Sequence, residues 1–581
     1  MNRRVRREVL LLLVLLWFVS TPLFWRLQVS HAPSGNYGAY DVFDMAPYSI
    51  FHMSVFYALM FASFYVRRYS LFNILMLALY HPGITVLANY PYLTFRDVYL
   101  HAAPVRTLLA AGNLQGYLVR DPSAEFWPST FVLHGVSALV LDSDLITINY
   151  VLYFCLVIGM ALVIYCLAKR LDKGGYTLAW VCPILFLALF QNHINSFYSY
   201  DRSHLSAVLV LFLLFASVRF ENRRGTIAQL LICGSLVTIH PMQSSYVSLF
   251  LLAPVALNIL NRSRARVFAR FNIALFSVVL FLAWFLFHTH VESEIIEMLG
   301  NFWTREYVQR VTNAVFVAEQ LPLWGSILRN FYKYSLLSLL LIGPSAYVIR
   351  LFKRERLSDE PSTIVTLLSV SVASALFTPV LLALPAWGLY RASTDFLAIP
   401  AAFSSIIYLN HAIRKKRSTL NKNTMRLVLL AFVMTLSMTT FTLRFEMNQY
   451  YSELEHPSEL SCLSFLFAHI QPSSRPHTIA ASFQTTVWAQ YYAYDSSHKF
   501  LRYVDPNDPD IYESQTRLFS SLTEAIDKSD FSIRGVRDMV LAPGQLQLSA
   551  ELTKRLSEQT TLPKFNQIYS NWYFSLCSKR N

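Results

Sequence analysis

Two residues that can transfer a proton, Asp97 and His101, lie four positions apart between Tyr92 and Thr130, and the cation Arg96 precedes them. On a helix this spacing places Asp97 and His101 on one face. The pattern predicts a reaction centre in which Asp97 is a general base or orients an acceptor hydroxyl. His101 would assist Asp97 or bind a phosphate. The alternative is a solvated loop with a helix N-cap at Asp97.

A helix must position this pair, and the apolar residues behind it repeat at helical spacing. They are Val98, Ala102, Val105, Leu108 and Leu109. One apolar face and one polar face are typical of an amphipathic helix that lies on a membrane surface. The pair would then sit at the depth of the lipid headgroups.

A second acidic pair, Asp41 and Asp44, lies three positions apart in an earlier polar stretch. Two carboxylates on one helical face can hold a divalent metal or an acceptor. A capped turn at a membrane boundary would need the same residue types. Both interpretations stay open at this point.

A dense polar cluster occurs further along the chain, where His193, Asp201, Arg202 and His204 fall within twelve residues. Such residues can line a cavity that receives a phosphate. They can equally face lipid headgroups at the end of a membrane span.

Two more candidates stand at the ends of apolar segments. His240 precedes Pro241, which interrupts an apolar run, so His240 is either a lipid-phosphate ligand or a structural histidine. Arg391 is a rare basic residue between two apolar segments, which favours an anionic partner. That partner is either Asp395, four residues on, or a substrate phosphate.

The composition places these residues in a membrane protein. The chain has 581 residues, 54% of them hydrophobic and 14% charged, with a mean hydropathy of +0.38. Soluble proteins carry about 25% charged residues. The net charge of +14 comes from short basic clusters between alternate apolar segments, which is typical of cytoplasmic loops and argues against a nucleic-acid site.

The apolar segments predict a polytopic helical bundle with about thirteen spans. We expect them at 8–28, 49–66, 71–90, 144–168, 175–193, 203–220, 225–241, 242–260, 271–290, 331–352, 363–386, 394–413 and 426–444. With the N-terminus in the cytoplasm, every inside loop is basic. The pair 225–241 and 242–260 is alternatively one re-entrant unit.

This orientation divides the chain into two predicted domains. Residues 1–444 form the transmembrane domain, with outer loops 29–48, 91–143 and 291–330. Residues 445–581 lack a run long enough to span and form a small extracytoplasmic α/β domain. Strands are expected at 478–481, 500–504 and 539–541, with a closing hairpin that turns at 570–571. The protein is thus expected in the plasma membrane, as a multi-pass chain.

The chain contains six cysteines. Four of them, Cys155, Cys166, Cys182 and Cys233, fall in apolar segments and are expected to fill the core. Cys462 and Cys577 fall in the C-terminal region and can pair if that region is outside the cytosol. No cluster of cysteine and histidine has zinc spacing.

Several stretches together resemble the GT-C membrane glycosyltransferases, chiefly their uncharacterised archaeal and bacterial members. RDVYLHAAPVRTLLAAGNL, followed by EFWPSTFVLHGVSALVLDSD, is similar to the family's first luminal loop with its interfacial helix, Trp-Pro and short helix. NSFYSYDRSHLSAVLVLFLL and TIHPMQSSYVSLFLL look like later spans of that family. IYSNWYFSL looks like the closing strand of its outer domain.

The resemblance implies transfer of a sugar from a polyprenyl phosphate or diphosphate to a protein, lipid or glycan acceptor at the outer membrane face. It gives the role of base to Asp97 and the lipid phosphate to Arg391. The family's acid usually follows the first span, where this chain has Asp41 and Asp44, so the base stays open among the three. The chain has no WWD motif, which argues against an oligosaccharyltransferase catalytic subunit.

The resemblance leaves the cofactor open. Many relatives with a monophosphate donor need no metal, whereas the diphosphate-using oligosaccharyltransferases do. Membrane lipids are expected partners and nucleic acid is not. Two other functions compete: a transporter or flippase for an amphiphilic substrate, which often has broken helices and inverted repeats, and a non-enzymatic assembly subunit.

Overall fold

The computed structural model describes a set of helices and five short strands. The described residues are 3–23, 47–66, 70–89, 96–112, 127–171, 177–193, 200, 202–219, 223–240, 247, 251–252, 267–288, 323–352, 398–415, 422–446, 477–481, 498–502, 531–535, 565–570 and 574–579.

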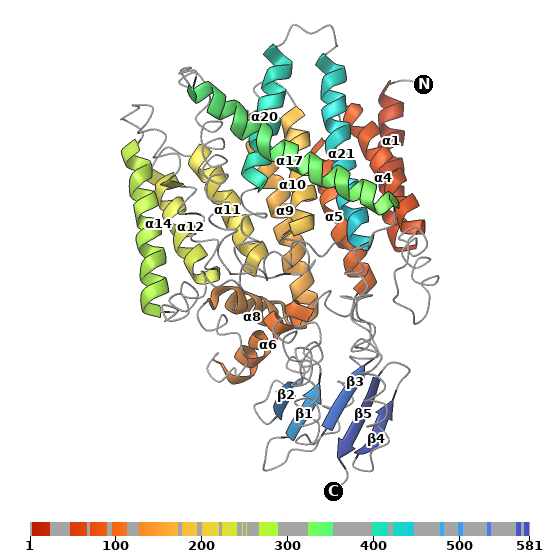
Figure 1. Cartoon of the computed structure of the whole chain (residues 1–581), viewed down its shortest axis with the longest axis vertical. Helices are drawn as coiled ribbons and strands as arrows, with labels where there is room; N and C mark the ends of the chain where they lie inside the picture. The colour runs from red at the N-terminus through yellow and green to blue at the C-terminus, as the bar shows by residue number, and fades with distance from the viewer. Residues whose placement is uncertain are drawn as a thin grey trace.

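The described helices form a bundle (Figure 1). They are α1 Arg3–Val19, α4 Pro47–Tyr65, α5 Ser70–Asn89, α6 Arg96–Ala111, α8 Ser129–Leu141, α9 Leu145–Leu171, α10 Thr177–His193, α11 Arg202–Arg219, α12 Arg223–Ile239, α14 Val267–His288, α17 Leu323–Phe352, α20 Ala398–Lys415 and α21 Lys422–Glu446.

Eleven of the predicted spans coincide with helices in this described part. The other two predicted segments fall outside it: 363–386 entirely, and 242–260 except for residues 247 and 251–252. The number of spans therefore stays a prediction. Within the described residues one helix, Leu145–Arg170, is long and apolar enough to cross a membrane, and a single such helix is weak evidence.

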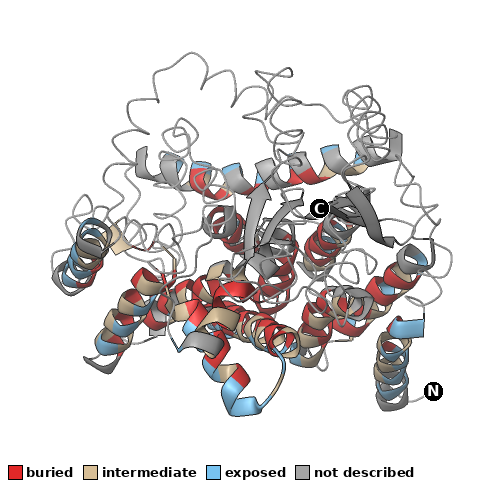
Figure 2. Ribbon diagram, turned by 90° about the horizontal axis from the view of Figure 1, so that it is seen from below, coloured by how far each residue is buried: buried red, intermediate tan, exposed pale blue. Residues whose placement is uncertain are grey.

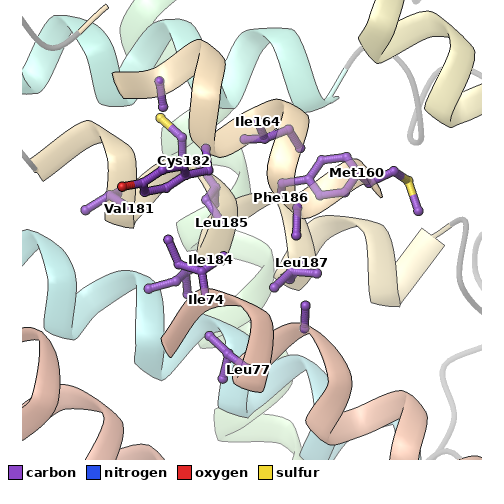
Figure 3. Close-up of a cluster of buried hydrophobic side chains, with 14 of the residues drawn as sticks. Ile74, Leu77, Met160, Ile164, Val181, Cys182, Ile184, Leu185, Phe186 and Leu187 are labelled. Carbon is purple, nitrogen blue, oxygen red and sulfur yellow. The ribbon is translucent and has the colours of Figure 1, made fainter. Parts of the chain in front are cut away.

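The centre of the bundle is α10, in which every residue from 177 to 188 is buried. A helix that is apolar on all sides has no face for solvent and must be surrounded by other helices. It packs against α9, α21, α20 and α5. Figure 3 shows this contact, where Leu185 and Phe186 of α10 lie among Ile164 of α9 and Ile74 of α5.

The peripheral helices expose apolar side chains on their outer faces (Figure 2). On α14 the exposed residues include Leu275, Phe276, Val279 and Leu282. Large apolar side chains on the outside of a bundle are stable in lipid and costly in water.

Two of the four cysteines that we expected in the core lie elsewhere. Cys182 and Cys233 are buried, as predicted, but Cys155 and Cys166 are exposed. Both exposed cysteines are on α9, which is buried on one side only, and an apolar segment does not reveal which of its faces is inward. Cys462 lies outside the described residues, so its pairing with Cys577 stays a prediction.

The C-terminal strands form one five-stranded sheet with the order β2-β1-β3-β5-β4. Their bounds are β1 His477–Ala481, β2 His498–Arg502, β3 Phe531–Gly535, β4 Phe565–Ser570 and β5 Phe574–Lys579. β1 pairs in parallel with β2 and β3, whereas β5 is antiparallel to β3 and β4.

This sheet tests the strand predictions. Strands occur near 478–481 and 500–504, and β4 and β5 form the expected closing hairpin. β3 was not predicted, and the expected strand at 539–541 and the segments between the strands fall outside the described residues. Parallel pairs such as β1 and β2 require crossover connections, which favours the predicted α/β arrangement of this region.

Two short helices, α6 and α8, cross one end of the bundle (Figure 1). We call this the α6 end. A small apolar cluster joins them to the start of α9, through Val105 of α6, Phe131 and Ala138 of α8, and Leu145 and Ile148 of α9. The cluster fixes both short helices to the bundle although neither is a predicted span.

Candidate functional site at the α6 end

Helix α6 confirms the predicted amphipathic segment. It begins at Arg96, so Asp97 lies at the N-terminal end of the helix. A carboxylate in the first turn is stabilised by the partial positive charge of the helix N-terminus. Only the backbone of Arg96 and Asp97 is described, so their place on the helix is known and their contacts are not.

The apolar face of α6 packs on α8 as its spacing predicts. Ala102 and Val105 are buried. Gly135 of α8 lies under this face: a Cβ there would stand 3.5 Å from both Val105 Cγ1 and Leu108 Cδ2. His101 is half-buried on the same helix, and its ring centroid lies 6.1 Å from that of Phe131.

The first turn of α8 joins three polar segments that are far apart in the sequence. Phe131 contacts His101 of α6. The backbone carbonyl of Thr130 accepts a hydrogen bond of 3.2 Å from the hydroxyl of Tyr200. The hydroxyl of Ser129 donates to the hydroxyl of Thr238 in α12 at 2.7 Å. Three consecutive residues of α8 thus contact α6, the residue shortly before α11, and the end of α12.

Tyr200 is the most firmly held of these partners and is only 2% exposed. Its amide donates to Oδ1 of Asn149 at 2.9 Å, and its carbonyl accepts from Nδ2 of Asn149 at 3.0 Å. The ring of His134 meets the Tyr200 ring edge-on, with centroids 5.6 Å apart. The backbone, ring and hydroxyl of Tyr200 each have a defined contact.

His134 fastens α8 to α9. Its Nε2–H donates to the carbonyl of Leu145 at 3.0 Å, which fixes the proton on Nε2. Burial, which that hydrogen bond only partly offsets, lowers the pKa of His134 from its ordinary 6.5 to about 4. His134 is therefore neutral at physiological pH, and its role here is positional.

The three predicted residues on α11 and α12 are at this end. Arg202 is the first residue of α11 and is half-buried, and its carbonyl accepts a hydrogen bond from Ser206. His204 is fully buried, with its ring edge-on to that of Tyr153 at 5.4 Å. His240 follows the last residue of α12, and its amide donates to the carbonyl of Leu236.

His204 is buried in this structure, and its predicted role toward a ligand stays a prediction. We expected it to line a cavity for a phosphate or to face headgroups, and here it is 0% exposed and packs on Tyr153 of α9. It therefore supports the packing of α11 on α9 in this conformation. Arg202 and His240, which are partly exposed, remain candidates for contact with a ligand.

Four predicted residues lie outside the described part of the chain: Asp41, Asp44, Asp201 and Arg391. Their roles stay predictions. Among the residues that the structure describes, no group of three or more His, Cys, Asp or Glu side chains could hold a metal ion. Asp41 and Asp44, the predicted metal pair, are not among the described residues, so this statement does not cover them.

No sequence pattern marks the residues that hold the site together, namely Ser129, His134, Asn149, Tyr200 and Thr238. Each lies within or beside an apolar run and has no partner nearby in the sequence that would mark it. The available signal was the presence of Asn149 and His134 in apolar segments, because buried polar side chains need partners.

No family model matches this chain, and no curated protein matches it.

The solved structures that are loosely similar to this chain include two of ArnT from Cupriavidus metallidurans. The structure bound to undecaprenyl phosphate has 12% sequence identity and a TM-score of 0.48, and the alignment covers 87% of this chain and 97% of that chain. The apo structure has 12% identity and a TM-score of 0.44, with 82% and 92% covered. At these values the likeness assigns neither a fold nor an activity to this chain.

Proposed function

We propose that this chain is an integral membrane glycosyltransferase that uses a sugar linked to a polyprenyl phosphate. Its acceptor is a protein, a lipid or a glycan at the outer membrane face. The basic clusters in the predicted inside loops support an orientation with the α6 end on the outer side and the N-terminus in the cytoplasm. The C-terminal residues 445–581 are then extracytoplasmic.

One observation supports this proposal more than any other. The first turn of α8 contacts His101 of α6, Tyr200 two residues before Arg202, and Thr238 two residues before His240. The helix that carries the candidate base Asp97 and two candidate phosphate ligands from two other segments therefore share one end of an apolar bundle. A lipid-linked donor requires this combination, because its chain lies in lipid and its phosphate lies at headgroup depth.

In the proposed reaction Asp97 removes the proton of an acceptor hydroxyl. The hydroxyl oxygen attacks the anomeric carbon of the donor sugar and forms the new glycosidic bond. The bond between that carbon and the phosphate oxygen breaks, and the electron pair leaves with the polyprenyl phosphate. Arg202, His240 and Arg391 are the candidate partners of that phosphate, and His101 assists Asp97.

The test uses the full-length protein in lipid nanodiscs with a panel of radiolabelled polyprenyl-phosphate sugars and a crude membrane acceptor fraction. The variants are Asp97→Asn, Asp41→Asn and Asp44→Asn. Asp142→Asn is the matched control, because Asp142 is an exposed carboxylate at the C-terminal end of α8, where Asn tolerates the positive φ of 45°.

Transfer by wild type and by Asp142→Asn, with a loss of at least about a hundredfold in Asp97→Asn, supports the proposed base. Loss only in Asp41→Asn or Asp44→Asn keeps the enzyme class and moves the base to the first outer loop. A folded wild-type protein that transfers sugar from no donor contradicts the proposal and favours a transporter or flippase of amphiphilic lipids.

A further inference from the structure

The first turn of α9, next to the candidate site, is held by hydrogen bonds with Asp144 and with α8. Asp144 caps this helix, since its Oδ1 accepts hydrogen bonds of 3.0 Å from the amides of Ile146 and Thr147. His134 binds the Leu145 carbonyl from the side of α8. With its first turn fixed by these contacts, α9 holds Asn149, one turn further on, at a defined position.

Asn149 uses both ends of its amide on a single residue. Its Oδ1 accepts from the Tyr200 amide and its Nδ2 donates to the Tyr200 carbonyl, at 2.9 and 3.0 Å. Asn149 is 1% exposed, so water cannot replace either bond. Aspartate would lose the donor and would set a carboxylate against a carbonyl, and alanine would lose both bonds.

Tyr200, whose backbone Asn149 binds, comes shortly before Arg202, the cation of the candidate site. Tyr200 lies two positions before Arg202, where α11 begins. Its hydroxyl is bound to the Thr130 carbonyl in the first turn of α8. Two residues of chain are too short to let Arg202 move independently, so the position of Tyr200 limits where the Arg202 guanidinium can reach.

We propose that Asn149 is a positioning residue: by holding the Tyr200 backbone, it keeps Arg202 where it binds the phosphate of the lipid-linked donor. This inference rests on the proposed function. Asn149 itself touches no substrate. Its effect on the reaction passes through Arg202, which contacts the donor phosphate in both the ground state and the transition state.

This mechanism predicts a specific kinetic pattern. The donor phosphate is already anionic before the bond breaks and gains charge as it breaks, so a weakened Arg202 contact is expected to raise the donor KM and also to lower kcat. Asn149→Ala is expected to raise the KM for the donor about tenfold, with the KM for the acceptor unchanged. Tyr200→Phe, which loses only the bond to Thr130, is expected to raise the donor KM about two- to threefold.

The matched control is Asn73→Ala. Asn73 is another fully buried asparagine and donates to Ser63 Oγ at 2.7 Å. It lies near the start of α5, at the opposite end of that helix from α6, and belongs to no candidate site. Its substitution is expected to lower thermal stability to a similar degree and to leave the donor KM within about twofold of wild type.

A double variant tests whether Asn149 acts through Arg202. The donor KM of the double variant Asn149→Ala, Arg202→Ala is expected to equal that of Arg202→Ala alone. Once the Arg202 side chain is removed, Asn149 has no cation to position. Additive effects of the two substitutions overturn the proposal. An unchanged donor KM in Asn149→Ala, or a raised donor KM in Asn73→Ala, also overturns it.

Direct binding of undecaprenyl phosphate to the same nanodiscs separates this inference from the proposed function. Weaker binding in Asn149→Ala but not in Asn73→Ala, from a protein that transfers no sugar, keeps the positioning role and rejects the transferase. Transfer with a normal donor KM in Asn149→Ala keeps the transferase and rejects the positioning role. A wild type that neither binds nor transfers rejects both.

Discussion

The hydroxyl of Ser405 in α20 contacts the backbone of α17 at Gly343. The Gly343 amide donates to Ser405 Oγ at 2.7 Å, and the Ser405 hydroxyl donates to the carbonyl of Leu339. The serine therefore binds an amide and a carbonyl of α17 at the point where α20 crosses it.

The crossing predicts that Gly343→Ala destabilises the protein. A Cβ at position 343 would stand 2.6 Å from the Ser405 amide nitrogen and 2.8 Å from the Ser404 carbonyl carbon, so α17 and α20 would have to separate. We expect a loss of about 1–3 kcal/mol, seen as a lower midpoint of thermal unfolding in detergent.

The control for this experiment is Gly159→Ala in α9, where a new Cβ would meet nothing within 4 Å. That change is expected to be neutral or to stabilise the helix by up to about 1 kcal/mol. Equal midpoints for the two variants would mean that the crossing is looser than described.

A second prediction concerns the hydroxyl of Thr130. Its Oγ1 is buried and has no hydrogen-bond partner within the part of the chain that the structure describes. Thr130→Val keeps the backbone carbonyl that binds Tyr200 and removes the buried hydroxyl, so we expect a gain of about 0.5–1 kcal/mol. Tyr200→Phe, which removes the donor to that carbonyl, should lose about 1 kcal/mol.

Chemical denaturation of both variants in the same detergent checks this pair of opposite signs. A loss of stability in Thr130→Val would show that Oγ1 has a partner in the folded protein.

A third prediction concerns pH. The folded pKa of His134 is about 4 against an ordinary 6.5, so the unfolded state binds a proton first as the pH falls. The stabilisation is fully present above about pH 6.5 and is lost progressively toward pH 4, by at most on the order of 3 kcal/mol. Thermal midpoints measured between pH 4 and pH 7.5 follow this loss.

The comparison variant is His134→Gln, which retains an N–H donor for the Leu145 carbonyl but does not titrate. Its midpoint should decline less steeply than that of wild type across the same pH range. Parallel slopes for the two proteins would exclude His134 as the source of the pH dependence.

A fourth prediction tests whether α6 must rest on α8 for activity. A Cβ added at Gly135 would stand 3.5 Å from side-chain carbons of Val105 and Leu108, which is an ordinary van der Waals contact. Gly135→Ala should therefore retain activity. Gly135→Leu is too large for this gap and should push α6 away. We expect sugar transfer to fall at least about tenfold with a loss of stability of about 1–2 kcal/mol.

Transfer rates and thermal midpoints of the two Gly135 variants, measured on the same preparations, decide this point. Full transfer by a folded Gly135→Leu protein would place the reaction centre away from α6.

The sequence alone determined several of the regular elements. Val105 and Ala102 recur at helical spacing, so the inward face of α6 was predictable. In the C-terminal region the strand at 478–481 and the closing hairpin were predictable too. Periodicity reports which face of an element is apolar because it depends only on neighbours along the same chain. It failed for Cys155 and Cys166, because an almost wholly apolar helix such as α9 shows no difference between its faces.

The tertiary structure alone decided which polar residues meet. Asn149 and Tyr200 are 51 positions apart, and Ser129 and Thr238 are 109 apart. Each pair forms because a buried polar group must find a partner wherever packing brings one, and local spacing carries no record of that partner. The same packing brings His204 against Tyr153, since only the approach of α9 to α11 determines what covers His204.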